Sequence, residues 1–441
     1  MSLYPISKNL TVTNNQIQNH NYWPVNSKDT EFDWDTVTGV VLSLALRQHV
    51  ISSDLEKFKH QCKERFEKKL DDKNIWPVLE RAYFNNDALY RVSPLFLLFK
   101  ANGKKSGQSA LSKPDERLCN LFAGLLGDFF LEDALYDQLN FVEQEMLSVL
   151  QENLQSGSLV KNDDEQPYLP FLNTVFREDI RFLAENPQYL LQALPGTLKL
   201  YAFSYCAQLA LNVTDWQNEP QSKPLYFILD SEKASSERMS VKRSGFKLLS
   251  AACDHVFPLL SLLDVLLKGS ESRKKPLWQV YRDAKQYINQ NELLEALNTY
   301  LQAFKEERKL QLEHSVASCV EEAFEQLKEF ALAQFRNSGR TRVIQMFARN
   351  LEKQVLSDFI QARGAAGRTL VLNQEQLLLL TNLTIGKAEK LRLHELRKGF
   401  ELRGFYLDNQ SLLQLVGFYE RMGNVERMSD SGDAVYVRKT L

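Results

Sequence analysis

The segment from residue 368 to residue 441 carries the most constraining pattern in the chain. Asn373 is suited to cap a leucine-rich helix, and residues 390–392 form a short strand after it. A second helix is expected over residues 393–403, and Gly404 is suited to stop it. These elements predict a compact module with its own core.

The second half of the same segment completes the pattern. Asp408 can cap a third helix that Gly423 ends. Residues 425–438 then alternate apolar and polar side chains on both sides of an SDSGD turn, which predicts a β-hairpin. The order helix, strand, helix, helix, hairpin predicts a winged helix-turn-helix.

The charges of this segment leave its function open between DNA contact and protein docking. Residues 368–441 hold eleven Lys and Arg against nine Asp and Glu, a net charge of +2. The third helix enters the major groove in DNA-reading winged helices. Here it presents Asn and Gln, which can pair with adenine, but a single cation gives little phosphate affinity. The candidate nucleic-acid-binding residues of the segment are Lys387, Lys390, Arg392, Arg397, Lys398, Arg403, Asn409, Gln410, Gln414, Arg421, Arg427, Arg438 and Lys439.

The remainder of the chain is predicted to be mostly α-helical. Of 441 residues, 44 % are hydrophobic, 25 % are charged and only 18 are Gly, which is typical of an ordered helical protein. We expect a multi-helical body followed by the α+β winged-helix module. The predicted parts are an extended polar arm (1–34), an N-terminal helical domain (35–215), a connector of one strand and a basic loop (216–247), a second helical region with a long helix pair (248–365) and the winged helix-turn-helix (366–441).

The Asn-rich arm and two basic segments are further places where nucleic acid could bind. An arm with aromatic residues could stack on bases, but we favour an arm that Trp23 and Trp34 pack against the body. The net charge of −2 leaves no chain-wide positive field, so phosphate contacts must be local. One basic segment is the loop 232–247 with Lys242 and Arg243. The other places Arg273, Lys274 and Lys275 near Trp278 and Tyr281, although an ordinary interhelical loop is the alternative.

No catalytic motif is recognisable in the sequence. There is no phosphate-binding loop, zinc site, nuclease motif or catalytic triad, and the six histidines lack metal-ligand spacing. Asp230 and Glu232 follow an apolar strand and could serve a metal-dependent nuclease, but the usual spacer and second strand are missing. We therefore expect a non-catalytic protein without cofactor or metal, with a nuclease subunit as the alternative.

Cysteine usage and hydropathy indicate a cytoplasmic protein. The five cysteines are scattered without a C-x-x-C pair, which fits a reducing compartment. The first ten residues contain no apolar leader core. The most apolar helix, at residues 257–269, carries Asp264 and is expected to be too short to span a bilayer. We expect no membrane contact.

The C-terminal segment resembles a known family. The run from KLRLHELRKGFELRGFYLD to SDSGDAVYVRK, above all SDSGDAVYV, resembles the C-terminal region of the DptG (DndG) family; the helical body matches it more loosely. The resemblance implies a subunit of the bacterial DNA phosphorothioation-dependent restriction system, acting against unmodified invading DNA. It also implies partner subunits with ATPase or helicase-type motors, and it supplies no catalytic residues. A winged-helix protein that organises chromosomes or regulates transcription is a further alternative.

Overall fold

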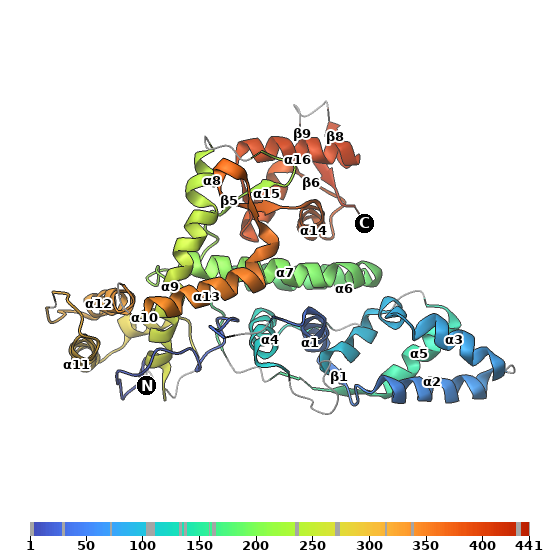
Figure 1. Cartoon of the computed structure of the whole chain (residues 1–441), viewed down its shortest axis with the longest axis horizontal. Helices are drawn as coiled ribbons and strands as arrows, with labels where there is room; N and C mark the ends of the chain where they lie inside the picture. The colour runs from blue at the N-terminus through green and yellow to red at the C-terminus, as the bar shows by residue number, and fades with distance from the viewer. Residues whose placement is uncertain are drawn as a thin grey trace. The chain divides into compact units, whose positions relative to one another are not determined.

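The structure is a computed structural model, and it describes residues 4–28, 31–70, 73–102, 111–131, 135, 139–157, 159–160, 165–233, 238–269, 274–313, 315–336, 339–428 and 434–440. Within these residues the chain forms sixteen α-helices and nine short strands, so the fold is mostly helical, as the sequence predicts (Figure 1). The chain divides into two compact units. The small unit comprises residues 30–162 and 176–199, and the large unit comprises residues 1–29, 163–175 and 200–440.

The small unit is helical with one short strand pair. Its first helix begins at Asp33, whose side chain accepts the Thr36 amide, and its fifth begins with a capping box between Asn140 and Glu143. Strand β1 pairs antiparallel with β2. Its elements are α1 (Trp34–Leu46), β1 (Gln48–Val50), α2 (Leu55–Lys69), α3 (Trp76–Tyr83), α4 (Lys113–Leu126), α5 (Phe141–Glu152) and β2 (Leu154–Ser156), with 3-10 turns at Lys73–Ile75, Ala88–Arg91 and Pro94–Asn102.

Helix α1 lies at the centre of the small unit because a glycine lets it approach its neighbour closely. A Cβ at Gly39 would lie 2.6 Å from the Ala101 amide nitrogen and 2.7 Å from the Leu97 carbonyl oxygen. No larger residue fits at such distances, so this position requires glycine. Most of α1 is consequently buried.

The large unit contains the remaining helices and two sheets. The chain crosses between the units within α6 (Pro170–Ala184) and α7 (Pro187–Asn212). The other elements of the large unit are β3 (Tyr226–Leu229), α8 (Met239–Ser244), α9 (Phe246–Leu267), α10 (Leu277–Gln286), α11 (Gln290–Arg308), α12 (Val320–Ala333), α13 (Thr341–Leu351), a π-helical turn (Glu352–Leu356), 3-10 turns (Ser357–Phe359 and Gly364–Ala366), β4 (Ile360–Ala362), β5 (Arg368–Leu372), α14 (Gln374–Ile385), β6 (Lys390–Arg392), α15 (Leu393–Leu402), β7 (Tyr406–Leu407), α16 (Asn409–Met422), β8 (Val425–Met428) and β9 (Ala434–Arg438).

Strand β3 is the centre of a four-stranded sheet with the order β4-β5-β3-β7. It pairs in parallel with β5 through Ile228 and Val371, and with β7 through Tyr226 and Tyr406. Phe227 and Ile228 are fully buried, as expected for a parallel strand covered on both faces. The sequence predicted β3 within a connector, whereas it pairs with two strands of the C-terminal segment.

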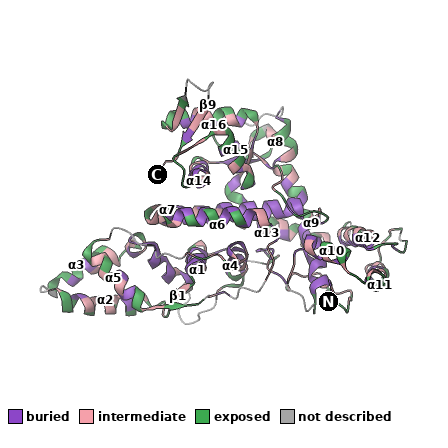
Figure 2. Cartoon of the chain, turned by 180° about the vertical axis from the view of Figure 1, so that it is seen from behind, coloured by how far each residue is buried: buried purple, intermediate pink, exposed green. Residues whose placement is uncertain are grey.

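Helix α9 is a core element of the large unit, and its length corrects an expectation. It spans 22 residues, so the prediction of a helix too short to cross a bilayer is wrong. By length and composition the segment Met239–Leu267 could cross a membrane, but 61 % of its most apolar window is buried within the structure. Phe257 packs on Phe347 of α13 with ring centroids 4.3 Å apart. Figure 2 shows the buried residues in purple.

The N-terminal arm is extended, as predicted, and it is bound along α9. The Asp264 carboxylate accepts the Gln18 amide at 3.0 Å and also the Asn19 amide and side chain. His20 contacts the Leu260 carbonyl at 3.1 Å, and Trp23 is 4 % exposed. Asp264 therefore orders the arm, which supports packing over base stacking.

The structure differs from the sequence prediction in three segments of the large unit. The loop predicted at 232–247 is helical from Met239, because α8 leads directly into α9. The second helical region, predicted over residues 248–365, breaks after α11, where Lys309 adopts a left-handed conformation, and it ends in β4. Residues 363–367, at the predicted boundary between the helical region and the winged helix-turn-helix, turn the antiparallel hairpin of β4 and β5, with the Arg363 amide donating to the Gly367 carbonyl at 2.8 Å.

Candidate nucleic-acid interface

Helices α14 and α16 of the C-terminal segment begin at the caps that the sequence predicts. Asn373 begins α14 with a capping box to Gln376, and Asp408 begins α16 by accepting the Ser411 amide. Gly423 ends α16 in the left-handed conformation at φ 73°. The turn at residues 429–433, including Asp430 and Asp433, lies outside the described residues.

Strands β6, β9 and β8 form a three-stranded antiparallel sheet, and its register separates its two faces. Leu391 of β6 pairs with Val437 of β9, which also pairs with Val425 of β8 and is fully buried. Neighbouring residues point to the opposite face. That opposite face, here called the outer face, consists of Lys390, Arg392, Glu426, Tyr436 and Arg438.

The outer face brings three predicted cations together around one tyrosine and one carboxylate. Glu426 accepts from Lys390 Nζ at 2.7 Å and from Arg438 Nη2 at 2.9 Å. The hydrogen bond from Lys390, and after it the one from Arg438, lowers the pKa of Glu426 below its usual value. Arg392 Nε donates to the Tyr436 hydroxyl at 2.9 Å. Lys390 Nζ lies 5.1 Å from the centroid of the same ring.

Tyr436 was absent from the predicted site, although the sequence contained the signal for it. The alternation in AVYVR places Val435 and Val437 on one face of β9 and Tyr436 and Arg438 on the other. A partly exposed cluster with three cations and one carboxylate can bind phosphate oxygens through its exposed Arg392 and Arg438.

The predicted cations in and around helix α15 differ in their exposure and in their partners. Arg397 is paired with Glu401 at 2.7 Å, one helical turn later. Lys387 and Lys398 are exposed, and Lys398 has no ion pair among the described residues. Arg403 is only 5 % exposed and donates to the Gly399 carbonyl at 2.9 Å and the Leu383 carbonyl at 3.2 Å. Because its donors are used inside the fold, Arg403 is a structural residue and not a surface contact.

The outward side of α16 is neutral and partly apolar. Asn409, Gln410, Gln414 and Arg421 are exposed. Leu413 is 73 % exposed between them, and the prediction did not include it. Leu415 and Tyr419, on the opposite side, are buried. This side presents amides and one leucine, with Arg421 at its far end.

Two further cations lie near the hairpin and have local partners. Arg427 pairs with Glu420 of α16 at 2.5 Å, so it braces the hairpin against the helix. Lys439 Nζ donates to the Gly386 carbonyl at 3.2 Å. Neither residue belongs to the outer face.

The two other predicted basic segments differ in the exposure and ion pairing of their cations. Lys242 and Arg243 are exposed on α8. Lys275 is paired with Asp283 at 2.5 Å, Lys274 is half-buried, and Arg273 lies outside the described residues.

The aromatic residues beside the second basic segment are not available for base stacking. Trp278 is 7 % exposed and donates from its indole nitrogen to the Tyr168 carbonyl, and Tyr281 is 5 % exposed. This favours the interhelical-loop interpretation.

A buried arginine links the carboxyl ends of β3 and β7, and it was not among the residues singled out from the sequence. Arg238 donates from Nη1 to Glu232 at 2.5 Å, from Nε to Asp408 at 2.9 Å and from Nη2 to the Ser411 hydroxyl at 2.6 Å. A second, shorter contact from Nη2 makes the Asp408 contact bidentate. Burial would raise the pKa of Asp408, but Arg238 and Ser411 outweigh it and lower that pKa.

The two acids of the nuclease alternative are both bound by arginines. Glu232 is 5 % exposed and is held by Arg238, while Asp230 Oδ1 pairs with Arg363 at 2.7 Å. Among the described residues, no group of three or more His, Cys, Asp or Glu side chains is placed to hold a metal ion. These contacts give Asp230 and Glu232 structural partners.

The chain was also compared with known proteins. It matches no protein-family model and no curated protein.

Proposed function

We propose that this protein is a non-catalytic DNA- and partner-contacting subunit of a phosphorothioation-dependent restriction complex that acts on unmodified invading DNA. The restriction assignment rests on the sequence resemblance, which also supplies the ATPase or helicase-type partners. The proposed cytoplasmic location rests on cysteine usage and hydropathy. We further propose that residues 366–441 form a winged helix-turn-helix. The order α14, β6, α15, α16, β8, β9 and the pairing of β6 and β8 with β9 support this assignment.

The outer face of the β6-β9-β8 sheet carries the proposal. Lys390, Arg392 and Arg438 lie in neighbouring register positions, and Arg392 and Arg438 are exposed. Cations at this spacing can replace counterions on a phosphate backbone. Contact of this kind is independent of base sequence, so it suits a complex that must engage any invading DNA.

Removing the three charges tests DNA contact. We expect the combined change of Lys390, Arg392 and Arg438 to Gln to weaken duplex binding by roughly tenfold or more, and to lower the slope of log affinity against log salt by about 2 to 3. A matched control removes three exposed cations of the small unit, Lys57, Lys68 and Arg91. Fluorescence anisotropy measures both. Equal losses in the two triple variants would contradict the proposal.

The outward side of α16 favours a partner instead of DNA. Leu413 is 73 % exposed and is flanked by uncharged Gln410 and Gln414. Burial of an exposed leucine stabilises a protein interface by roughly 1 to 2 kcal/mol. We expect Leu413→Asp to reduce co-purification with the motor subunits while DNA binding is retained. Val78→Asp, at a residue of the small unit that is 65 % exposed, is the matched control.

The nuclease alternative has a direct test. The non-catalytic assignment predicts no magnesium-dependent cleavage of DNA by the purified chain. Cleavage that Asp230→Ala abolishes, with the fold intact by circular dichroism, would contradict it.

A further inference from the structure

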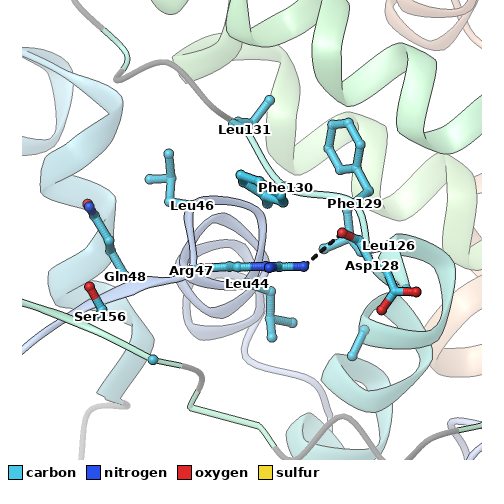
Figure 3. Close-up of a pocket in the computed structure, with 13 residues that line it drawn as sticks. Leu44, Leu46, Arg47, Gln48, Leu126, Asp128, Phe129, Phe130, Leu131 and Ser156 are labelled. Carbon is cyan, nitrogen blue, oxygen red and sulfur yellow. Dashed lines mark hydrogen bonds between the residues drawn. The ribbon is translucent and has the colours of Figure 1, made fainter.

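A pocket in the small unit has no role in the proposed function. Its volume is about 670 Å³, within the usual range of small-molecule sites. It lies where α1 and α4 end, beside Ser156, the last residue of β2 (Figure 3). Seven of its lining side chains are apolar, namely Ala123 and the larger Leu44, Leu46, Leu126, Phe129, Phe130 and Leu131.

Arg47 places a cation among these apolar walls. The residue ends α1 in the left-handed conformation at φ 51°, and its amide donates back to Leu44 and Ser43. The Arg47 side chain extends across the pocket beside Phe130 (Figure 3). Its Cζ lies 4.3 Å from the Phe130 ring centroid, and Nη2 donates to the Asp128 carbonyl at 2.8 Å. The ring and the carbonyl therefore hold the guanidinium in place.

The charge of Arg47 has no compensating carboxylate in the part of the chain that the structure describes. Figure 3 shows the Asp128 carboxylate directed away from the guanidinium. Burial lowers the pKa of Arg177, and the charge of Asp128 opposes that shift, so the Asp128 carboxylate acts on Arg177. A guanidinium has five N–H donors, and the single contact to the Asp128 carbonyl uses one of them.

An apolar pocket with one fixed cation, which no carboxylate of the described residues pairs with, is complementary to one kind of ligand. We propose that it binds a small organic monoanion with an apolar body, of which a medium-chain carboxylate is the simplest example. The carboxylate pairs with Arg47, and the chain packs on Leu46, Leu126 and Leu131. This site does not depend on the proposed DNA contact.

Calorimetric titration of the full chain with octanoate tests the proposal, with octanol as the uncharged comparison. We expect saturable octanoate binding at one site and at least tenfold weaker octanol binding, because a charge-assisted hydrogen bond contributes about that much. Arg47→Gln should weaken octanoate by a similar factor, while Arg47→Lys should weaken it less. Arg421→Gln, at an exposed arginine of the large unit, should leave it unchanged.

A second pair of variants keeps the test decisive even if Arg47→Gln does not fold. Ser156 lines the pocket, whereas Gln155 precedes it on the strand and points to the opposite face. Both are exposed, so a tryptophan is tolerated at either position. Ser156→Trp should abolish octanoate binding and Gln155→Trp should retain it. Octanol binding as tight as octanoate, no saturable octanoate binding, or equal effects of the two tryptophans would overturn the proposal.

Discussion

The two sheets of the large unit use arginine in opposite ways. In the β4-β5-β3-β7 sheet, Arg238 is buried at the carboxyl ends of β3 and β7 and is bound by two carboxylates and a hydroxyl. In the β6-β9-β8 sheet, Arg392 and Arg438 lie on an exposed face. The same residue type therefore has two roles. An arginine whose carboxylate partners are buried stabilises the fold, whereas an arginine on an exposed sheet face remains available to a ligand.

The largest expected loss of stability follows from replacing the buried Arg238. Arg238→Met leaves Glu232 and Asp408 without their cation, and breaking a buried pair in this way costs about 3 to 5 kcal/mol. We expect the thermal midpoint of the large unit to fall by several degrees.

The matched change on the exposed face is Arg392→Met, which we expect to alter stability by less than about 0.5 kcal/mol. Differential scanning calorimetry compares the two variants. Similar thermal midpoints for the two variants would contradict the distinction between the buried and the exposed arginine.

A smaller effect is expected at the second buried arginine. Arg403→Met removes donors from the Leu383 and Gly399 carbonyls and leaves a buried acceptor unpaired, at a cost of about 1 to 3 kcal/mol. Arg397→Met on the same helix is the control, because its pair with Glu401 is exposed. Denaturant unfolding followed by circular dichroism measures both, and an Arg403 variant as stable as the Arg397 variant would show that Arg403 is not structural.

The sequence was sufficient for elements fixed by local chemistry. Asn373, Asp408 and Gly423 cap their helices as predicted, because a cap depends on residues within three or four positions. The strand at residues 390–392 and the hairpin were also predicted, since period-two alternation is visible over a few residues.

The sequence could not supply contacts between distant segments. Strand β7 has only two residues and β5 is a buried run without polar alternation, so neither shows the period-two pattern. Both pair with β3, which precedes them by more than a hundred residues. The burial of Arg238 and Arg403 follows from this pairing and from helix packing, so local composition did not reveal it. The sequence supplied Lys390, Arg392 and Arg438 as candidate contacts, but their grouping on one sheet face around Tyr436 follows from the register.

The smallest expected effect concerns pH. The pKa of Asp408 is lowered in the folded state from its usual 3.8, mainly by Arg238 and Ser411 against the effect of burial. Its contribution to stability is therefore complete above 3.8 and is lost as the pH falls through the lower folded-state value. We expect the stability difference between the wild type and Asp408→Asn to shrink below pH 3.8, as measured by urea unfolding from pH 6 downward. A difference that stays constant would mean that the Arg238 contact does not stabilise the ionised form.

We propose that DNA lies against the outer face of the β6-β9-β8 sheet and not against α16. Photocrosslinking tests it directly, with benzoylphenylalanine placed at Tyr436 in one variant and at Gln410 in another, each mixed with duplex DNA. We expect crosslinks from position 436 and none from position 410. Crosslinks from position 410 without any from position 436 would contradict the proposal.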